Sequence, residues 1–457
     1  MSLGLESGRV RTVIMGAAGR DFHNFNTLHR GNERSNVVVF TATQIPGIGG
    51  RTYPGSLAGS LYPEGIPIHH EAELEGLIRG KAIQRVEFAY SDVTQRRVME
   101  LGSMVQSWGA EFVLPNLRAT MIESNLPVIS VCAVRTGCGK SQTTRRVVEE
   151  LKKLDLRPVV IRHPMPYGDL EKQAVQRFET MEDLDRHECT IEEREEYAPH
   201  IAAGTVVYAG VDYRKILEQA EKEADVILWD GGNNDIPFYT SRKHLQIVVV
   251  DPLRPGHELL YYPGETNFRM GHVIVMNKMN SATPEGINIL ERNIADVNPF
   301  ATVIRANSEI SVDDPSVIRD KRVLVIEDGP TVTHGDMTTG AGIIAAQSFG
   351  AFNIFDPFQI AVGSMRETLD KHRHLEGTGI LPAMGYGKEQ LADLQATIQA
   401  AVNLGHIDSV VIGTPIDLAS LIKIDVPHTR VRYDLKEINL SLETVIREFW
   451  STAVWEK

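Results

Sequence analysis

Cysteine and long apolar runs are scarce in this sequence of 457 residues, and acidic residues outnumber basic ones by 60 to 47. The three cysteines form no C-x-x-C pair, so neither a disulfide framework nor a zinc site is predicted. The longest apolar runs, such as Leu245–Val250, are far too short to span a bilayer. The net charge of −13 argues against a general nucleic-acid binder, which needs a basic face. We therefore expect a cytoplasmic protein that binds neither membranes nor nucleic acids.

Short apolar runs alternate with segments of helical spacing from one end of the chain to the other. This alternation predicts an α/β fold, in which parallel sheets are covered by helices on both faces. Residues 1–125 are expected to form one α/β domain, because Asn125 follows a predicted helix and precedes Pro127. Residues 126–457 are expected to form the remainder, with a subdivision near residue 313.

A glycine-rich loop between a predicted strand and a predicted helix is the most informative motif. Val128–Val134 has the composition of a buried strand, and Arg135–Ser141 follows it with two glycines. This is the context of a P-loop, whose backbone N–H groups turn toward phosphate oxygens. Lys140 is expected to reach the β- and γ-phosphates, and Ser141 to ligate Mg²⁺. The predicted nucleotide-binding residues of this loop are Thr136, Gly137, Cys138, Gly139, Lys140, Ser141 and Gln142.

The loop departs from the usual P-loop spacing at one position. Val134 stands where a first glycine is usual, and a chance Gly-Lys-Ser in a glycine-rich turn is the alternative interpretation. Thr136–Ser141 resembles the TGxGK[ST] loop of dethiobiotin synthetase and its relatives. In a related subgroup a second lysine stands where this chain has Arg135, which that resemblance makes a catalytic candidate. An exposed surface arginine is the alternative.

A second predicted strand, Ala224–Asp230, ends in a carboxylate. Behind a P-loop, an aspartate in this place is expected to orient Mg²⁺ or its water ligands. Asp230 is therefore a predicted catalytic and metal-binding residue. Asn233 and Asn234 follow in a tight loop and are candidates for positioning substrate or water, with a plain turn as the alternative.

The predicted strand Val273–Met276 is followed by Asn277 and Lys278, a pattern similar to the N-K-x-D motif with which GTPases read the base. Asn277 is then expected to face the purine, with Lys278 beside it. Asn280 stands where the motif has aspartate, and its amide presents both a donor and an acceptor, which damages the guanine signal. We therefore expect ATP, with GTP as the alternative.

Basic side chains at other predicted strand ends are candidates for contacts to a phosphorylated substrate. Arg162 and His163 stand where dethiobiotin synthetase-like enzymes have a Lys-Pro element that contacts phosphate or substrate. Arg162 is therefore a predicted catalytic residue and His163 a substrate-binding one, with a structural His–carboxylate pair as the alternative. Arg254 also follows a predicted strand, and ligands of open α/β sheets bind outside the carboxyl ends of strands. The acidic stretch Glu188–Glu196 is predicted to be a solvated helix face.

Two glycine-rich loops of the first domain carry further candidates. Gly16–Gly19 follows a predicted strand and hints at a dinucleotide-binding fingerprint, but Phe22 stands at the third glycine position. The same loop can bind a smaller phosphorylated ligand, with Arg20 and His23 as its partners. Arg51 lies in a second such loop and is a candidate substrate clamp, with an irregular loop as the alternative.

The segment Glu327–Gly340 concentrates acids, hydroxyls, glycines and His334 at the end of a predicted strand. A plain turn needs none of these functional groups. The segment therefore predicts a site, with His334 as a substrate-binding candidate.

The order of these motifs resembles the cyclic 2,3-diphosphoglycerate synthetase-like family, whose members are described as predicted P-loop GTPases. The resemblance covers nearly the full chain and is strongest at Thr136–Ser141 and at Asp328–Thr331. It implies a P-loop NTPase sheet preceded by a Rossmann-like α/β domain. It also implies an ATP- or GTP-dependent ligase that uses Mg²⁺ and acts on a phosphorylated metabolite, such as 2,3-diphosphoglycerate, which it would cyclise. Relatives of this P-loop subclass are commonly dimers, so a homodimer is expected.

Two other functions remain open at this point. A GTPase switch or metallochaperone-like protein would bind a protein partner and hydrolyse the nucleotide slowly. A nicotinamide-binding enzyme would use the first domain and would bind its dinucleotide without Lys140.

Overall fold

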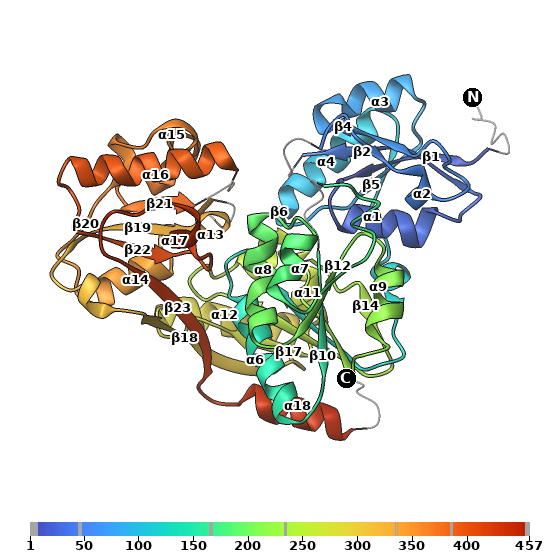
Figure 1. The fold of residues 1–457 in the computed structure, drawn as a ribbon. Helices are drawn as coiled ribbons and strands as arrows, with labels where there is room; N and C mark the ends of the chain where they lie inside the picture. The colour runs from blue at the N-terminus through green and yellow to red at the C-terminus, as the bar shows by residue number, and fades with distance from the viewer. Residues whose placement is uncertain are drawn as a thin grey trace.

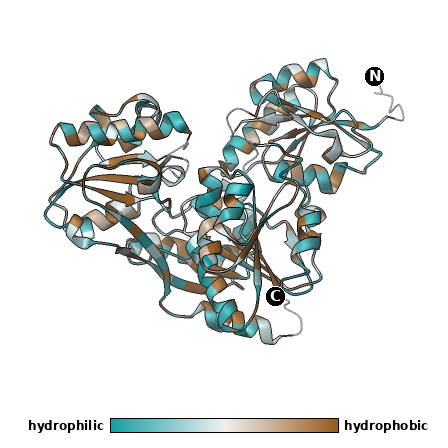
Figure 2. Ribbon diagram, viewed as in Figure 1, coloured by the Kyte–Doolittle hydropathy of each residue, from teal (hydrophilic) through white to brown (hydrophobic). Residues whose placement is uncertain are grey.

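The computed structural model describes residues 8–43, 48–163, 168–232, 235–333, 335, 337–383 and 387–452. They form an α/β molecule with three lobes (Figure 1). We refer to the N-terminal domain (residues 8–120), the central domain (residues 121–312 and 438–452) and the C-terminal domain (residues 313–437). In Figure 2 the strands are mainly hydrophobic, and the helices around them carry most of the hydrophilic residues. The predicted α/β class is confirmed.

The N-terminal domain contains a six-stranded sheet in the order β3-β4-β2-β1-β5-β7. Its pairs are parallel except for β3 with β4. Val13 and Met15 of β1 pack into one hydrophobic core and Ile14 into another, because alternate residues of a strand point to opposite faces. Both faces are therefore covered, as in a Rossmann-like domain. Its elements are β1 (Val10–Met15), α1 (Arg20–Asn24), η1 (Phe25–His29), β2 (Ser35–Ala42), β3 (Thr52–Tyr53), α2 (Gly55–Ala58), β4 (Ile66–His70), η2 (Glu71–Glu73), α3 (Leu74–Gly80), β5 (Arg85–Phe88), β6 (Val93–Thr94), α4 (Gln95–Ser107), β7 (Glu111–Val113) and α5 (Leu117–Thr120).

The central domain is built on the parallel strands β12-β10-β13-β9-β15-β17-β18, with β11 antiparallel at the edge. The strand β9 lies in the middle, and all six of its residues are buried, as expected for a strand covered on both faces. Its elements are β8 (Ile122–Glu123), β9 (Val128–Ala133), α6 (Lys140–Lys153), β10 (Pro158–Arg162), β11 (Gln176–Phe178), α7 (Met181–Arg186), α8 (Ile191–Ala202), β12 (Val206–Ala209), α9 (Tyr213–Ala220), β13 (Val226–Trp229), β14 (Tyr239–Thr240), β15 (His244–Val250), α10 (His257–Leu260), β16 (Tyr261–Tyr262), α11 (Gly264–Met270), β17 (Val273–Met276), α12 (Pro284–Val297) and β18 (Thr302–Val312).

The C-terminal domain continues the same sheet through β18-β23-β22-β19-β20, with β21 beside β19. The long strands β18 and β23 pair antiparallel from Ala306 opposite Glu437 to Val312 opposite Val431, and they link the two domains (Figure 1). After β23 the chain returns to the central domain, where α18 packs against α6. The elements of the C-terminal domain are η3 (Pro315–Val317), β19 (Arg322–Asp328), α13 (Gly329–Thr333), α14 (Ala341–Ser348), β20 (Asn353–Ile354), η4 (Pro357–Gln359), α15 (Gly363–Lys371), η5 (Arg373–Leu375), β21 (Ile380–Ala383), α16 (Lys388–Asn403), β22 (Ser409–Gly413), α17 (Leu418–Leu421) and β23 (His428–Glu437), whereas α18 (Leu442–Ser451) belongs to the central domain.

A buried ion pair joins the N-terminal domain to the central domain. Arg20 Nε lies 2.5 Å from Asp235 Oδ1, and Arg20 NH2 donates to Ile236 O at 2.8 Å. The His23 ring stacks on Phe238 with 3.9 Å between centroids, and burial lowers the pKa of His23 to about 3, so its ring is neutral. Arg20 and His23 are 5% and 1% exposed. Their predicted role in binding a substrate phosphate is therefore not supported, because both side chains are enclosed in a domain interface.

We predict that Arg20→Met lowers the free energy of unfolding by about 3–5 kcal/mol, because Asp235 would stay buried without the guanidinium. Chemical denaturation of the full chain measures the change. Arg79→Met is the matched control: the pair between Arg79 and Glu75 is 60% and 52% exposed, so at most about 1 kcal/mol is expected. Equal losses in the two variants would contradict a structural role for the buried pair.

Candidate active site

The predicted P-loop connects the carboxyl end of β9 to Lys140, the first residue of α6. Two of its glycines adopt left-handed backbone conformations, with φ of 81° at Gly137 and 103° at Gly139. A Cβ atom at Gly139 would also collide with the side-chain amide of Asn277. Glycine is therefore required at these positions. The turn leads into a helix of 14 residues, whose first N–H groups have no partner within the helix.

Three consecutive carbonyl groups of the loop are held by side chains that follow β15 and β17. The three hydrogen bonds run from Arg254 NH2 to Thr136 O (2.9 Å), from Lys278 Nζ to Gly137 O (2.6 Å) and from Asn277 Nδ2 to Cys138 O (2.9 Å). In a trans peptide the N–H group points away from the C=O group. The next three N–H groups therefore point away from these donors, which gives the loop the concave, N–H-lined form that binds phosphate.

One buried carboxylate supports two of the three donors. Asp251 Oδ2 lies 3.1 Å from Arg254 NH2 and 2.9 Å from Lys278 Nζ. Burial alone would raise the pKa of Asp251, but the charges of Lys278 and Arg254 hold that pKa below its ordinary value. The carboxylate is thus ionised at neutral pH and fixes both cations beneath the loop.

These contacts correct three predictions. Asn277 and Lys278 were expected to read the base, but both side chains hold the P-loop, and Asn277 is fully buried. Asn280 exchanges two hydrogen bonds with the backbone of Ser308, at 3.1 and 3.2 Å. Arg254 was a candidate for substrate binding, but its NH1 group donates to Gly335 O at 2.7 Å while NH2 holds the loop. Asn277, Lys278 and Arg254 therefore donate to the backbone of the P-loop and support the conformation of the phosphate site.

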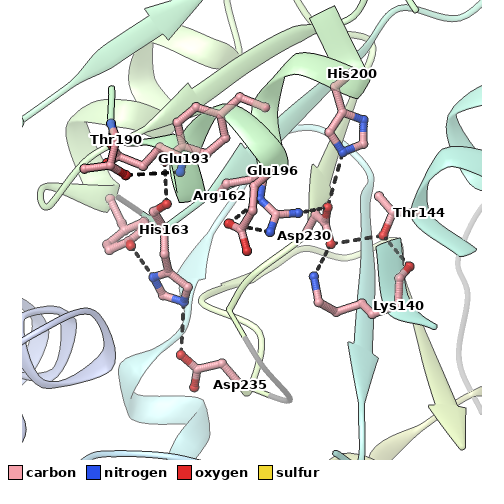
Figure 3. A network of polar contacts seen from close by, with 12 residues as sticks. Lys140, Thr144, Arg162, His163, Thr190, Glu193, Glu196, His200, Asp230 and Asp235 are labelled. Atoms are coloured by element: carbon pink, nitrogen blue, oxygen red, sulfur yellow. Dashed lines mark hydrogen bonds and ion pairs between the residues drawn. The ribbon is translucent and has the colours of Figure 1, made fainter. Parts of the chain in front are cut away.

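Asp230, at the end of β13, is the centre of a buried polar network (Figure 3). Its Oδ1 accepts from Lys140 Nζ and, at 3.0 Å, from Thr144 Oγ1. Its Oδ2 accepts from Arg162 NH1 and, at 3.3 Å, from His200 Nε2. Burial would raise the pKa of Asp230, but Arg162 and Lys140 hold that pKa well below its usual range. The aspartate orients the P-loop lysine, and both its oxygens are already occupied by protein donors, which argues against a direct metal bond.

The two arginines predicted to be catalytic are both enclosed by other side chains. Arg162 is 2% exposed and lies between Asp230 and Glu196, with 2.6 Å from its NH2 to Glu196 Oε2. Arg135 is 1% exposed, and its guanidinium carbon lies 3.6 Å from the centroid of the Tyr261 ring. The alternative of an exposed surface arginine at position 135 is therefore wrong. Both arginines border the cavity described next, but their charges are balanced by protein groups.

A cavity of about 280 Å³ lies in front of the P-loop, between the central and C-terminal domains. One wall is the P-loop with Lys140, Ser141 and Arg145. The opposite wall comes from the carboxyl ends of β19 and β22, with Gly340, Gly413 and the start of α14. The predicted site segment after Ile326 therefore faces the phosphate loop. The described residues that line the cavity belong to the central and C-terminal domains, and none of them to the N-terminal domain.

Acidic side chains form a second part of the cavity lining. They come from α8 and from the end of β19: Glu192, Glu195, Glu196, Glu327 and Asp328. Burial, together with the neighbouring charges of Asp328 and Glu196, raises the pKa of Glu195 well above its ordinary value. The prediction that Glu188–Glu196 is a solvated helix face is therefore wrong for this face of α8. Only the arrangement of the two domains shows that it borders a cavity.

Two other predicted substrate contacts, His163 and Arg51, are not among the described residues that line this cavity. His163 Nε2 is 3.1 Å from Asp235 Oδ2, and its Nδ1 is 2.6 Å from Tyr213 OH, which makes it the structural His–carboxylate pair that was the alternative. Arg51 NH2 donates to Gly168 O of the central domain. Three further candidates lie outside the described residues: Asn233, Asn234 and His334.

Within the described residues, no helix is long and apolar enough to cross a bilayer. In the same part of the chain, no group of three or more His, Cys, Asp or Glu side chains is arranged to hold a metal ion.

We predict that Lys278→Met weakens ATP and GTP binding by the same factor, because the lysine holds the loop and does not face the base. Loss of a hydrogen bond from a charged donor costs about 1.5–3 kcal/mol, which is roughly tenfold to over a hundredfold in Kd. Calorimetric titration with both nucleotides measures it. Asn280→Asp is the control for base reading, and its ratio of GTP to ATP affinity should equal that of the wild type. A ratio that moves toward GTP would restore the base-reading hypothesis.

We predict a pH-dependent stability contribution from Glu327. Burial raises its pKa to about 7 from an ordinary value of 4.5, although N–H groups such as that of Ile343 (2.7 Å) lower it. The folded state thus holds this proton more tightly than the unfolded state, so the stability is present below pH 4.5 and is lost as pH rises toward 7. Glu327→Gln keeps the oxygen acceptor and should lose less stability over that window. Parallel curves of unfolding free energy against pH would contradict the assignment. Asp21, whose pKa is also raised to about 7 by burial, contributes equally to both curves.

The chain has little similarity to protein-family models and to two solved structures. No protein-family model matches it. Among solved structures, LpxK from Aquifex aeolicus in complex with ATP is 11% identical, with a TM-score of 0.43, over 82% of this chain and 99% of that one. A murein peptide ligase from Psychrobacter arcticus is 11% identical, with a TM-score of 0.26, over 97% and 94%. Neither similarity is high enough to support an argument about function.

One curated relative is much more similar. The arginine synthetase ArcE of Thermococcus kodakarensis is 56% identical over 446 residues, which covers 98% of each chain. These comparisons do not confirm the resemblance to the cyclic 2,3-diphosphoglycerate synthetase-like family. The conformation of a P-loop is observed in the structure. The protein belongs to the family of the arginine synthetase ArcE and is an enzyme of the synthetase class.

Proposed function

We propose that this chain catalyses the ATP-dependent formation of arginine. The observation that supports the proposal is a cavity whose lining combines the P-loop with five acidic side chains. The P-loop side suits a triphosphate, and the carboxylate side suits a cationic substrate or product. The name of the relative supplies the product, and the remaining question is which acceptor the P-loop can activate.

Phosphoryl transfer from ATP needs an acceptor oxygen, and the guanidinium of arginine has none. Citrulline differs from arginine only in bearing an oxygen where one guanidinium nitrogen stands. Transfer of the γ-phosphoryl group to this ureido oxygen releases ADP and turns the oxygen into a leaving group. Ammonia then attacks the carbon, the C–O bond breaks, and phosphate leaves with the oxygen. From ammonium, citrulline and ATP, the products are arginine, ADP, phosphate and one proton, so atoms and charges balance.

The residues around the P-loop would bind the phosphates of ATP and the metal ion. Lys140, oriented by Asp230, lies where the β- and γ-phosphates would bind and neutralises charge that develops during transfer. Bound Mg²⁺ would supply further charge neutralisation on the phosphates. Ser141, at the start of α6 and on the cavity, fits as its protein ligand, whereas Asp230 fits only through water, because protein donors occupy its oxygens.

The acidic wall supports a cationic ligand and argues against a polyanion. Glu195 and Asp328 approach each other from α8 and β19, and each raises the cost of ionising the other. An ammonium or guanidinium group between them would relieve this repulsion. A diphosphorylated substrate would increase it, so the proposal replaces diphosphoglycerate with a substrate of the citrulline and arginine class. A homodimer, expected from the P-loop subclass, is proposed as well, and the mass in solution tests it.

We predict arginine and ADP in equal amounts when the protein is incubated with MgATP, citrulline and ammonium. ATP hydrolysis without arginine would instead favour the nucleotide-switch alternative.

Glu195→Gln and Asp328→Asn should each weaken arginine binding roughly tenfold or more, since a charge-assisted hydrogen bond contributes about 1.5–3 kcal/mol. Calorimetric titration with arginine measures this without turnover. Glu149→Gln is the matched control: the Glu149 side chain on α6 is 60% exposed, and the variant should bind arginine as the wild type does. Unchanged arginine affinity in both cavity variants would remove the acidic wall from the proposal.

A further inference from the structure

The structure assigns Asp92 of the N-terminal domain as a positioning residue that sets the conformation of the P-loop. The assignment rests on the proposed function only in that the P-loop binds a nucleoside triphosphate. It gives the N-terminal domain a task other than the substrate binding expected from its glycine-rich loops. Asp92 touches two consecutive residues at the entrance of the loop, Arg135 and Thr136.

The chain around Asp92 lies where the N-terminal domain contacts the central domain. Asp92 follows β5 and precedes β6, which pairs antiparallel with β16 of the central domain, Thr94 opposite Tyr261 and Val93 opposite Tyr262. Its φ of 61° lies in the left-handed region, which aspartate tolerates better than most residues. This backbone conformation and the strand pair fix where its side chain points.

The carboxylate of Asp92 forms one contact with each oxygen. Oδ1 lies 2.8 Å from Arg135 Nε, and Oδ2 accepts a hydrogen bond of 2.5 Å from Thr136 Oγ1. The Asp92 side chain is only 10% exposed and that of Arg135 only 1%, so the pair is shielded from water. Removing one partner of a buried ion pair is strongly unfavourable, so this carboxylate contributes to holding Arg135 in place.

The central domain completes the cage around Arg135. The ring of Tyr261, on the strand that pairs with β6, lies against the guanidinium at 3.6 Å. Arg135 NH1 donates to His257 Nδ1 at 3.0 Å, which requires that nitrogen to be unprotonated. The guanidinium is therefore held on its face by one domain and on its edges by both.

Arg135 and Thr136 are the first two residues of the turn that forms the phosphate site. Cys138 N donates to Arg135 O at 3.4 Å, and Gly137, the third residue, has the positive φ that a type II turn requires at this place. Lys278 and Asn277 of the central domain hold the exit of this turn. At its entrance, Arg254 holds the carbonyl group of Thr136, and Asp92 holds the Thr136 hydroxyl and the Arg135 guanidinium. Without Asp92 the entrance loses a fixed charge partner and a hydrogen-bond acceptor, and the N–H groups that follow lose their alignment.

A double-mutant cycle on the full chain tests the inference, with calorimetric binding of MgATP as the readout. Asp92→Asn keeps an acceptor for Thr136 and tolerates the left-handed backbone but removes the charge. We expect its Kd for MgATP to rise about tenfold. In an Arg135→Gln background the same change should alter Kd less than about twofold, because the charge then has no partner. Arginine affinity should stay at the wild-type value in Asp92→Asn.

Asp155→Asn is the matched control, since Asp155 has a φ of 59° and is exposed at the end of α6. It should leave MgATP affinity unchanged. If Asp92→Asn does not fold, Thr136→Val removes the hydroxyl contact alone and should still weaken MgATP binding.

Wild-type MgATP affinity in Asp92→Asn, or an equal effect with and without Arg135, would overturn the inference. A wild-type enzyme that binds MgATP but makes no arginine would contradict the proposed function alone, because the cycle reads only nucleotide binding.

Discussion

The phosphate site depends on three hydrogen bonds that hold consecutive carbonyl groups of the P-loop. Arg254, Lys278 and Asn277 supply the donors. Asp251 beneath them keeps the two cations, Arg254 and Lys278, in place. The glycines allow the backbone conformation of the turn, and the three donors fix the direction in which its carbonyl groups point. The order of the sheet explains why they are available: β15 lies beside β9 and β17 beside β15, so their carboxyl ends all surround the loop.

The three domains contribute to this site in different ways. The central domain supplies the loop, and the C-terminal domain supplies the opposite wall of the cavity. These two walls belong to one continuous sheet, because β18 and β23 pair along seven residues of each strand. Among the residues that the structure describes, the N-terminal domain adds none to the cavity lining but contacts the loop from outside through Asp92. The cavity is thus formed by two domains and held in shape by a third.

The P-loop was predictable because strand, glycines, lysine and helix follow one another in the chain, so local sequence defines them. The Asn277-Lys278 pair was misinterpreted because a donor at a strand end faces either a base or a neighbouring loop, and only tertiary structure chooses. Arg20 was misinterpreted for a related reason: a guanidinium after a glycine-rich loop suits an anion and an interfacial aspartate equally. Helical spacing predicted a polar face for Glu188–Glu196 but not the domain opposite it.

The charge of the cavity determines which acceptors can approach the triphosphate. Lys140 and Arg162 are already paired with Asp230 and Glu196, so they leave little positive charge for a second anion. Two like charges 4 Å apart repel by about 4 kcal/mol at an effective dielectric constant of 20, and a polyanion near Glu195 and Asp328 would meet several such terms. In the proposed reaction, citrulline has no net charge, and its α-ammonium group can face the carboxylates while its neutral ureido group faces the γ-phosphate. Under this proposal the same carboxylates would attract the cationic product, so side chains that repel polyanions would also orient a substrate whose reactive end is uncharged.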